Sequence, residues 1–170
     1  VDAFEVKLEV DFSRSGLPGF SMVGLAEGAV REAGSRVFTA LRHCGCKPPP
    51  GKITVHLAPA DCRKAGSAYD LPLALGLLCA SGHLPQEALD GFYCLGELSL
   101  TGEVRPVPGI LPVALLAARQ KARGLIVPAG NAAEGAVVGD IPVYGVASLS
   151  EAIAFLAGEI SLAPMPVQDL

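Results

Sequence analysis

Hydrophobic and polar residues alternate over two stretches in the first third of the chain, which is typical of a β-strand with one solvent-facing side. The first stretch covers residues 5–11 and the second covers residues 52–57. Residues 20–24 predict a further strand, after a loop rich in Gly and Pro. We interpret the strands at 5–11 and 20–24 as consistent with a hairpin that has a long loop.

A helical period replaces this alternation over residues 26–44. Apolar residues recur along one stripe, and the opposite side carries polar and basic residues. The stripe comprises Ala26, Val30, Ala33, Val37, Leu41 and Cys44. Gly45 is a plausible helix stop, and the run from Pro48 to Gly51 forbids any continuation of the helix.

The rest of the chain continues the alternation of strands and helices. Helices are predicted over 67–81, 109–122, 132–138 and 148–157, strands over 124–128 and 142–146, and a hairpin over 93–107 that turns at Thr101-Gly102. This order indicates an α/β (α+β) sandwich of two layers. The pattern fades near Gly158, so we expect one domain over residues 1–158 and a linker over 159–170.

Composition favours a soluble cytoplasmic protein. The chain has 170 residues, of which 51% are hydrophobic, yet its longest apolar runs are far shorter than the roughly 18 residues that cross a bilayer. Its first residues do not resemble a signal peptide. The five cysteines include no Cys-x-x-Cys pair and form no ligand spacing with the histidines, so we expect free thiols and no metal site.

The net charge of −4 conceals a basic window over residues 28–66, which holds seven basic and two acidic residues and is therefore +5. A local basic zone can bind nucleic acid, although a solvated surface is the commoner explanation. The candidate DNA-binding residues are Arg31, Arg42, Lys47, Lys52, Arg63 and Lys64. Contacts of such residues with the DNA backbone carry no sequence preference and weaken with salt, so we expect weak, non-specific, salt-sensitive DNA binding.

Two nucleotide-binding motifs are missing from the sequence. No Gly-x4-Gly-Lys-[Ser/Thr] loop occurs, and no Gly-x-Gly-x-x-Gly follows a strand. This segment is therefore not expected to bind ATP or a dinucleotide by either device, and we expect no cofactor in it.

The most distinctive stretch is residues 53–72, where a strand leads through a charged loop into a turn of small residues and a buried helix. Together with residues 17–25, 95–107, 125–131 and 143–146, it resembles the N-terminal domain of the ComM/YifB family of magnesium-chelatase-related AAA+ ATPases. The resemblance implies a fold like the Lon peptidase domain and the second domain of ribosomal protein S5. It also implies a following AAA+ module that binds ATP and Mg²⁺, assembly as a homo-hexamer, and DNA branch migration in natural transformation.

The likeness to Lon can be tested at its catalytic residues. Lon pairs a serine in Gly-Pro-Ser-Ala-Gly with a lysine in Gly-Gly-Leu-Lys-Glu-Lys. The serine corresponds to Ser67, but Leu111 and Val113 stand where the lysines would be. A serine hydroxyl without a base is a poor nucleophile, and neither Lys64 nor Lys121 lies in an apolar context that would make it one.

We therefore interpret Ser67 as a vestigial catalytic candidate that acts as a helix cap, and the domain as a non-catalytic assembly or DNA-guiding module. The alternatives are a Lon-like serine peptidase with a displaced base and an RNA-binding module. The RNA-binding alternative rests on fold analogy alone, and the acidic net charge counts against it. Asp70 is expected to complement the dipole of its helix, and Arg105 to pair with Glu97 or Glu103 beside the predicted hairpin turn.

Overall fold

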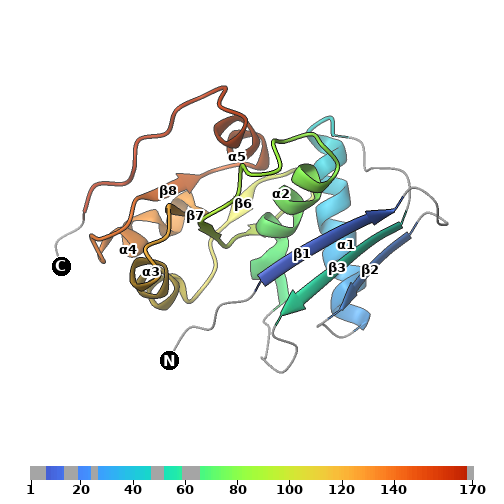
Figure 1. Cartoon of the computed structure of the whole chain (residues 1–170), viewed down its shortest axis with the longest axis horizontal. Helices are drawn as coiled ribbons and strands as arrows, with labels where there is room; N and C mark the ends of the chain where they lie inside the picture. The colour runs from blue at the N-terminus through green and yellow to red at the C-terminus, as the bar shows by residue number, and fades with distance from the viewer. Residues whose placement is uncertain (1–6, 14–18, 24–26, 47–51, 59–65, 168–170) are drawn as a thin grey trace.

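The computed structural model describes residues 7–13, 19–23, 27–46, 52–58 and 66–167, with side chains described over 32–46 and 67–167. Within these ranges two three-stranded sheets and one two-stranded sheet are combined with helices (Figure 1). The α/β class expected from the sequence is confirmed. The closer likeness to the Lon peptidase domain and to ribosomal protein S5 stays a prediction.

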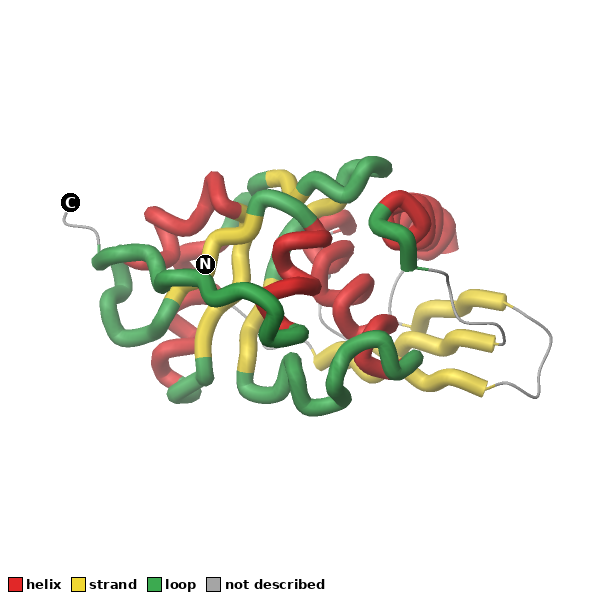
Figure 2. Tube along the Cα trace, turned by 90° about the horizontal axis from the view of Figure 1, so that it is seen from above, coloured by secondary structure: helices red, strands yellow, loops and turns green. Residues whose placement is uncertain are grey.

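The first sheet contains β1 (Lys7–Ser13), β2 (Gly19–Val23) and β3 (Lys52–Ala58). β3 lies in the middle, antiparallel to β1 and parallel to β2. The expected hairpin of the first two strands is therefore wrong, because each of them pairs with β3. Figure 2 shows this sheet at one side of the molecule.

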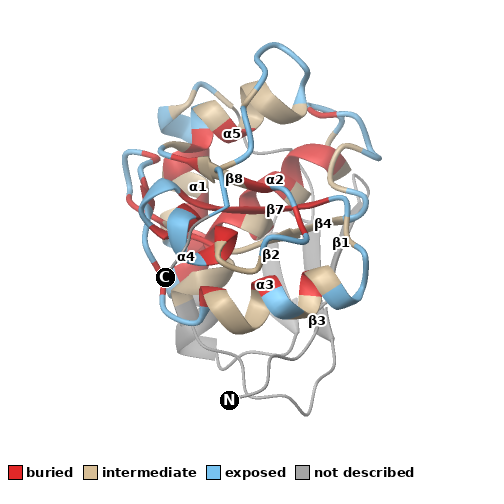
Figure 3. Ribbon diagram, turned by 90° about the vertical axis from the view of Figure 1, so that its left-hand side faces the viewer, coloured by how far each residue is buried: buried red, intermediate tan, exposed pale blue. Residues whose placement is uncertain are grey.

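Two helices supply most of the larger hydrophobic cluster. α1 (Glu27–His43) is confirmed as an amphipathic helix, since Ala33, Val37 and Leu41 of its predicted stripe are buried. α2 (Asp70–Ala80) follows a short 3-10 helix, η1 (Gly66–Tyr69), and is buried on nearly all sides. A helix that is apolar all round belongs in an interior, and Figure 3 shows α2 there, with buried surface along most of its length.

The second sheet is parallel and contains β4 (Phe92–Cys94), β7 (Gly124–Pro128) and β8 (Val143–Val146), with β7 in the middle. Alternate residues of β7 face two different hydrophobic clusters. Ile126 joins the cluster of α1 and α2, and Leu125 and Val127 join the cluster of α3 (Ile110–Arg119) and α4 (Ala132–Ala136). Helices therefore cover both faces of this sheet. The domain thus has more layers than the two-layer sandwich that the sequence predicted.

The predicted hairpin over 93–107 is only partly correct. Its strands are β5 (Glu97–Leu98) and β6 (Val104–Arg105), whereas residues 92–94 form β4 and pair with β7. α5 (Leu149–Leu156) begins as predicted: Ser148 is its N-cap, and the Ser148 Oγ accepts a hydrogen bond of 3.1 Å from the Glu151 amide. The short helix η2 (Ala129–Asn131) completes the described elements.

The last described residues, 159–167, contain no helix or strand but lie along the domain. Leu162 packs on the cluster of α1 and α2, and Met165 packs on the cluster of α3 and α4. The Met165 amide also donates a hydrogen bond of 2.7 Å to the Val143 carbonyl of β8. The domain boundary at residue 158 stays a prediction. Among the described helices, none has the length and apolar character to span a membrane.

Candidate functional site

The turn that carries Ser67 is held by the chain that leads into β5. The Gly96 amide donates to the Ala68 carbonyl, and the Leu71 amide donates to the Gly96 carbonyl, both at 2.9 Å. A side chain at Gly96 would meet the Leu71 side chain and Val104 at 3.1 Å, so only glycine lets the two segments approach this closely. The position of Ser67 is therefore fixed by packing against β5 and β6.

Asp70, the first residue of α2, is 1% exposed and forms a two-point ion pair with Arg36 of α1. Arg36 Nε donates to Asp70 Oδ2 at 2.7 Å, and Arg36 Nη2 donates to Oδ1 at 3.1 Å. The Leu98 amide of β5 donates a third hydrogen bond to Oδ2 at 3.1 Å. The Asp70 carboxylate thus links α1, α2 and β5. The sequence predicted only that Asp70 complements the dipole of α2.

The two partners of this pair have shifted pKa values. The hydrogen bond to Asp70 raises the pKa of Arg36, even though partial burial of the guanidinium opposes that shift. Burial raises the pKa of Asp70 above the ordinary carboxyl range, and the hydrogen bonds from Arg36 and Leu98 oppose this shift without cancelling it. For Asp70, the loss of hydration on burial thus outweighs the stabilisation of the carboxylate by Arg36 and the Leu98 amide.

The sequence contains one signal for this pair. Arg36 lies three residues after Ala33 and four before Ala40, both of which are buried, so it falls beside the apolar stripe of α1. A charged residue in that position needs a buried partner. The partner is 34 residues further along the chain, which no local pattern identifies.

Ser67 is half-buried within η1. The expectation that Ser67 caps α2 is wrong: the N-cap position is Tyr69, and no side chain makes the capping hydrogen bond. Asp70 is not free to act as a base for Ser67 either, because Arg36 and the Leu98 amide occupy its oxygens.

The start of α3 is the segment that the sequence resemblance aligns with the lysine of Lon. Gly109 precedes the helix with a φ of 84°, a conformation that favours glycine. Asn131, whose side chain is buried, binds the Val107 backbone in both directions, accepting from its amide at 2.9 Å and donating to its carbonyl at 3.1 Å. The Leu111 amide donates to the Glu134 carboxylate at 3.2 Å. Packing and hydrogen bonds therefore hold the segment that leads into α3. No basic residue takes part in these contacts.

The segments that match the two halves of the Lon dyad meet on one hydrophobic cluster. Ala68, next to Ser67, packs on the cluster that contains Ile110, the first residue of α3. Val113 packs on the same cluster, and Leu111 is half-buried. The turn that carries Ser67 and the start of α3 thus contribute to one hydrophobic cluster, and their correspondence to the Lon dyad stays a prediction.

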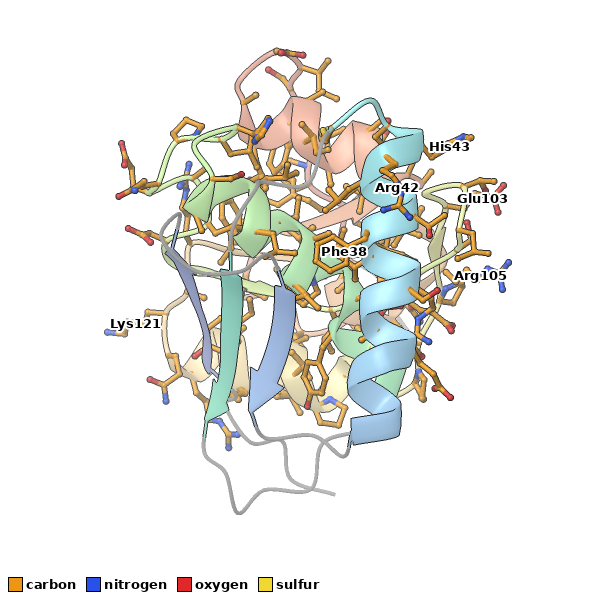
Figure 4. All side chains as sticks on the ribbon, turned by 90° about the vertical axis from the view of Figure 1, so that its right-hand side faces the viewer. Phe38, Arg42, His43, Glu103, Arg105 and Lys121 are labelled. Atoms are coloured by element: carbon orange, nitrogen blue, oxygen red, sulfur yellow. The ribbon has the colours of Figure 1, made fainter. Side chains whose placement is uncertain are left out.

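Neither alternative lysine is placed next to Ser67 by the structure. Lys121 follows the C-terminal end of α3, is exposed, and points away from the body of the domain on the side opposite α1 (Figure 4). Lys64 lies outside the described residues. The absence of a base for the Ser67 hydroxyl stays a prediction from the sequence.

The basic window is described only in part. Arg42, near the end of α1, is exposed, and its guanidinium donates to Thr39 Oγ1 at 3.2 Å. Arg31 lies in α1 and Lys52 begins β3, but their side chains are not among those described, and Lys47, Arg63 and Lys64 lie outside the described residues. The structure thus does not test whether the six candidates form one patch.

Arg36 changes the charge count of this window, because the buried carboxylate of Asp70 neutralises it. Figure 4 shows Arg42 and His43 at one end of α1, on the same side of the molecule as Glu103 and Arg105 of the hairpin. The described part of this surface therefore carries charges of both signs.

The hairpin does not contain the ion pair that was expected. Glu97 and Arg105 are register partners across β5 and β6, yet the ion pair found among the described side chains is that between Arg36 and Asp70. Glu97 instead lies close enough to influence the pKa values of both members of that pair. In the described part of the chain, no three His, Cys, Asp or Glu side chains gather in a way that could hold a metal ion.

Comparison with known proteins gives consistent matches. Residues 8–131 match the family model described as subunit ChlI of Mg-chelatase. The competence protein ComM of Haemophilus influenzae is 44% identical over 162 residues, which are 95% of this chain and 31% of that protein. The uncharacterized protein YifB of Salmonella typhimurium is 42% identical over 170 residues, which are 100% of this chain and 33% of that protein.

A third relative, an uncharacterized protein of Mycobacterium tuberculosis, is 42% identical over 163 residues, which are 96% of this chain and 32% of that protein. The chain thus spans about a third of the length of the curated relatives that it matches.

Proposed function

The chain belongs to the family of the Mg-chelatase subunit ChlI, and we propose that it is the non-catalytic N-terminal domain of a ComM/YifB-type AAA+ ATPase. In this proposal the domain assembles with the following ATPase module, which binds ATP and Mg²⁺ and forms a homo-hexamer. The domain helps to guide DNA through branch migration during natural transformation.

One observation supports the non-catalytic role above the others. The turn with Ser67 and the start of α3 lie on a common hydrophobic cluster, but Leu111 and Val113 occupy the lysine positions. Such a site keeps the scaffold of a peptidase and lacks its base. The 44% identity with a protein named for competence supports the DNA-related part of the proposal.

The experiment that tests this function uses the full-length parent protein. We expect ATP hydrolysis that DNA stimulates, and DNA binding that weakens with salt because phosphate contacts release counterions. The test variants are Arg63→Glu and Lys64→Glu, alone and together. If both residues contact phosphates, the double variant lowers the slope of log affinity against log salt by roughly 2.

Lys121→Glu is the matched control for Lys64→Glu, since it makes the same change of charge at an exposed lysine on the side opposite α1. It should leave both affinity and slope unchanged. If the double variant also leaves them unchanged, the DNA-guiding role is wrong and the domain acts in assembly only. An absence of ATP hydrolysis in the wild-type parent protein would contradict the proposal as a whole.

The competing function is a Lon-like peptidase with a displaced base, and the observation that favours it is the common hydrophobic cluster of Ala68 and Ile110. We expect no cleavage of casein or fluorogenic peptides at high protein concentration. Cleavage that disappears in Ser67→Ala would establish the peptidase and refute the non-catalytic role. Ser150→Ala, at an exposed serine elsewhere, controls for a contaminating protease.

A further inference from the structure

The outer side of α3 is unusually apolar for a helix at the surface. Ile110, Ala114 and Ala117 face the core, while Leu111, Leu115 and Ala118 form a stripe at helical spacing beside them. Leu115 is 48% exposed, Leu111 and Ala118 are half-buried, and the helix has no charged residue before Arg119. A surface helix normally carries polar residues on its outer side, so an apolar stripe of this kind marks a contact surface.

The described chain ends beside β8 and Gly139, on the side of the molecule that also carries α3. Met165 packs on the same hydrophobic cluster as the buried side of α3, and its hydrogen bond to the Val143 carbonyl fixes it against β8. Val167, the last described residue, lies against Gly139, where an added Cβ would be 3.6 Å from its side chain. Figure 1 shows the segment that follows α5 passing β8 toward the side of the molecule where α3 and α4 lie.

Val167 is itself 61% exposed, so two of the four large hydrophobic residues exposed in the described part, Leu115 and Val167, belong to the segments on this face. We propose that the apolar stripe of α3 is the docking surface for the part of the parent chain that follows residue 170. This inference rests on the proposed function, in which an ATPase module follows the domain.

Two observations favour a segment of the same chain as the occupant. The relatives are about three times as long as this chain, so a large part of a parent protein of that length is not represented here. The segment over residues 159–167 is also held on the domain by Leu162 and Met165, and Met165 packs on the cluster that includes the buried side of α3. A tethered partner has a high effective concentration, which makes a small apolar stripe sufficient for docking.

The test compares two exposed leucines in the full-length parent protein. Leu115→Lys places a charge in the stripe, and Leu100→Lys does the same at the turn of the β5–β6 hairpin, where the leucine is 53% exposed. Limited proteolysis measures the rate of cleavage at residues 157–170, and light scattering measures the mass of the assembly. We expect Leu115→Lys to accelerate that cleavage at least five-fold with unchanged mass, and Leu100→Lys to match the wild type.

The other outcomes overturn the proposal. Equal cleavage rates in both variants and the wild type mean that nothing docks on the stripe, and equal acceleration in both means that the effect is not specific to it. A fall in mass caused by Leu115→Lys assigns the stripe to a second copy of the chain. Leu115→Gln, a milder change, keeps the test valid if the lysine variant does not fold. Failure of the proposed function appears separately, as an absence of ATP hydrolysis in the wild type.

Discussion

Replacing Arg36 with methionine tests the ion pair that joins α1, α2 and β5. Methionine keeps an apolar side chain of similar length and removes the guanidinium. Asp70, which is 1% exposed, then keeps only the hydrogen bond from the Leu98 amide. Breaking a buried ion pair by removing one partner costs about 3–5 kcal/mol. We expect a loss of about 3 kcal/mol at neutral pH, at the lower end of this range, because the Arg36 side chain is 23% exposed and the Leu98 bond remains.

The loss should depend on pH, because burial raises the pKa of Asp70 and Arg36 opposes that rise. Without Arg36, the pKa of Asp70 in the folded state moves still further above its unfolded value. A carboxyl group with a raised folded-state pKa contributes stability below its unfolded pKa, and this contribution is lost as pH rises through the folded pKa. The destabilisation by Arg36→Met should therefore be largest at neutral pH and should shrink as the solution becomes acidic.

Urea unfolding at neutral pH and at the lowest pH where the wild type stays folded measures this difference. Arg42→Met is the matched control on the same helix, because Arg42 is exposed and bonds only to the neighbouring Thr39. It should cost less than about 0.5 kcal/mol at either pH. Asp70→Asn should cost about 1–2 kcal/mol, less than Arg36→Met, because it leaves an acceptor for Leu98 and a guanidinium that can reach water. A loss in Arg36→Met that equals the control, or that does not change with pH, would refute this reasoning.

Two further substitutions test contacts that position other parts of the domain. Ser148→Ala removes the hydroxyl that caps α5 and accepts from the Glu151 amide, so thermal unfolding should show a loss of about 1 kcal/mol. Ser150→Ala in the same turn should change stability by less than half as much, and equal losses would show that the cap is unimportant. Asn131→Ala leaves the buried amide and carbonyl of Val107 without partners, so urea unfolding should show a loss of about 2–4 kcal/mol; a loss below about 1 kcal/mol would mean that water replaces the amide.

Local periodicity predicted most elements because the apolar pattern of a segment reflects the face that it buries. The stripe of α1 was readable for this reason, and β7 was predicted over its full extent at residues 124–128. The same pattern does not identify a strand's partner. Residues 5–11 and 20–24 indicated strands correctly, but their pairing with β3 depends on contacts between distant parts of the chain.

For the candidate site, too, the sequence identified residues but not their distant partners. The lack of a lysine at Leu111 could be read directly, because it requires only the identity of a residue. The roles of Asp70 and Asn131 could not, since each depends on partners at least 24 residues away in sequence. Residues 92–94 were assigned to the wrong sheet because a three-residue strand is too short to show a period.

The central position of β3 has a consequence for the order in which the protein is made. A ribosome releases the chain from its N-terminus, so β1 and β2 emerge before the strand that both of them require. At about 5–20 residues per second, synthesis of residues 24–58 takes roughly two to seven seconds, during which the edges of both strands lack a partner. A neighbouring nascent chain that has already produced its own β3 can fill that gap. Strand exchange between chains translated from one message is therefore the misassembly to which this topology is most exposed.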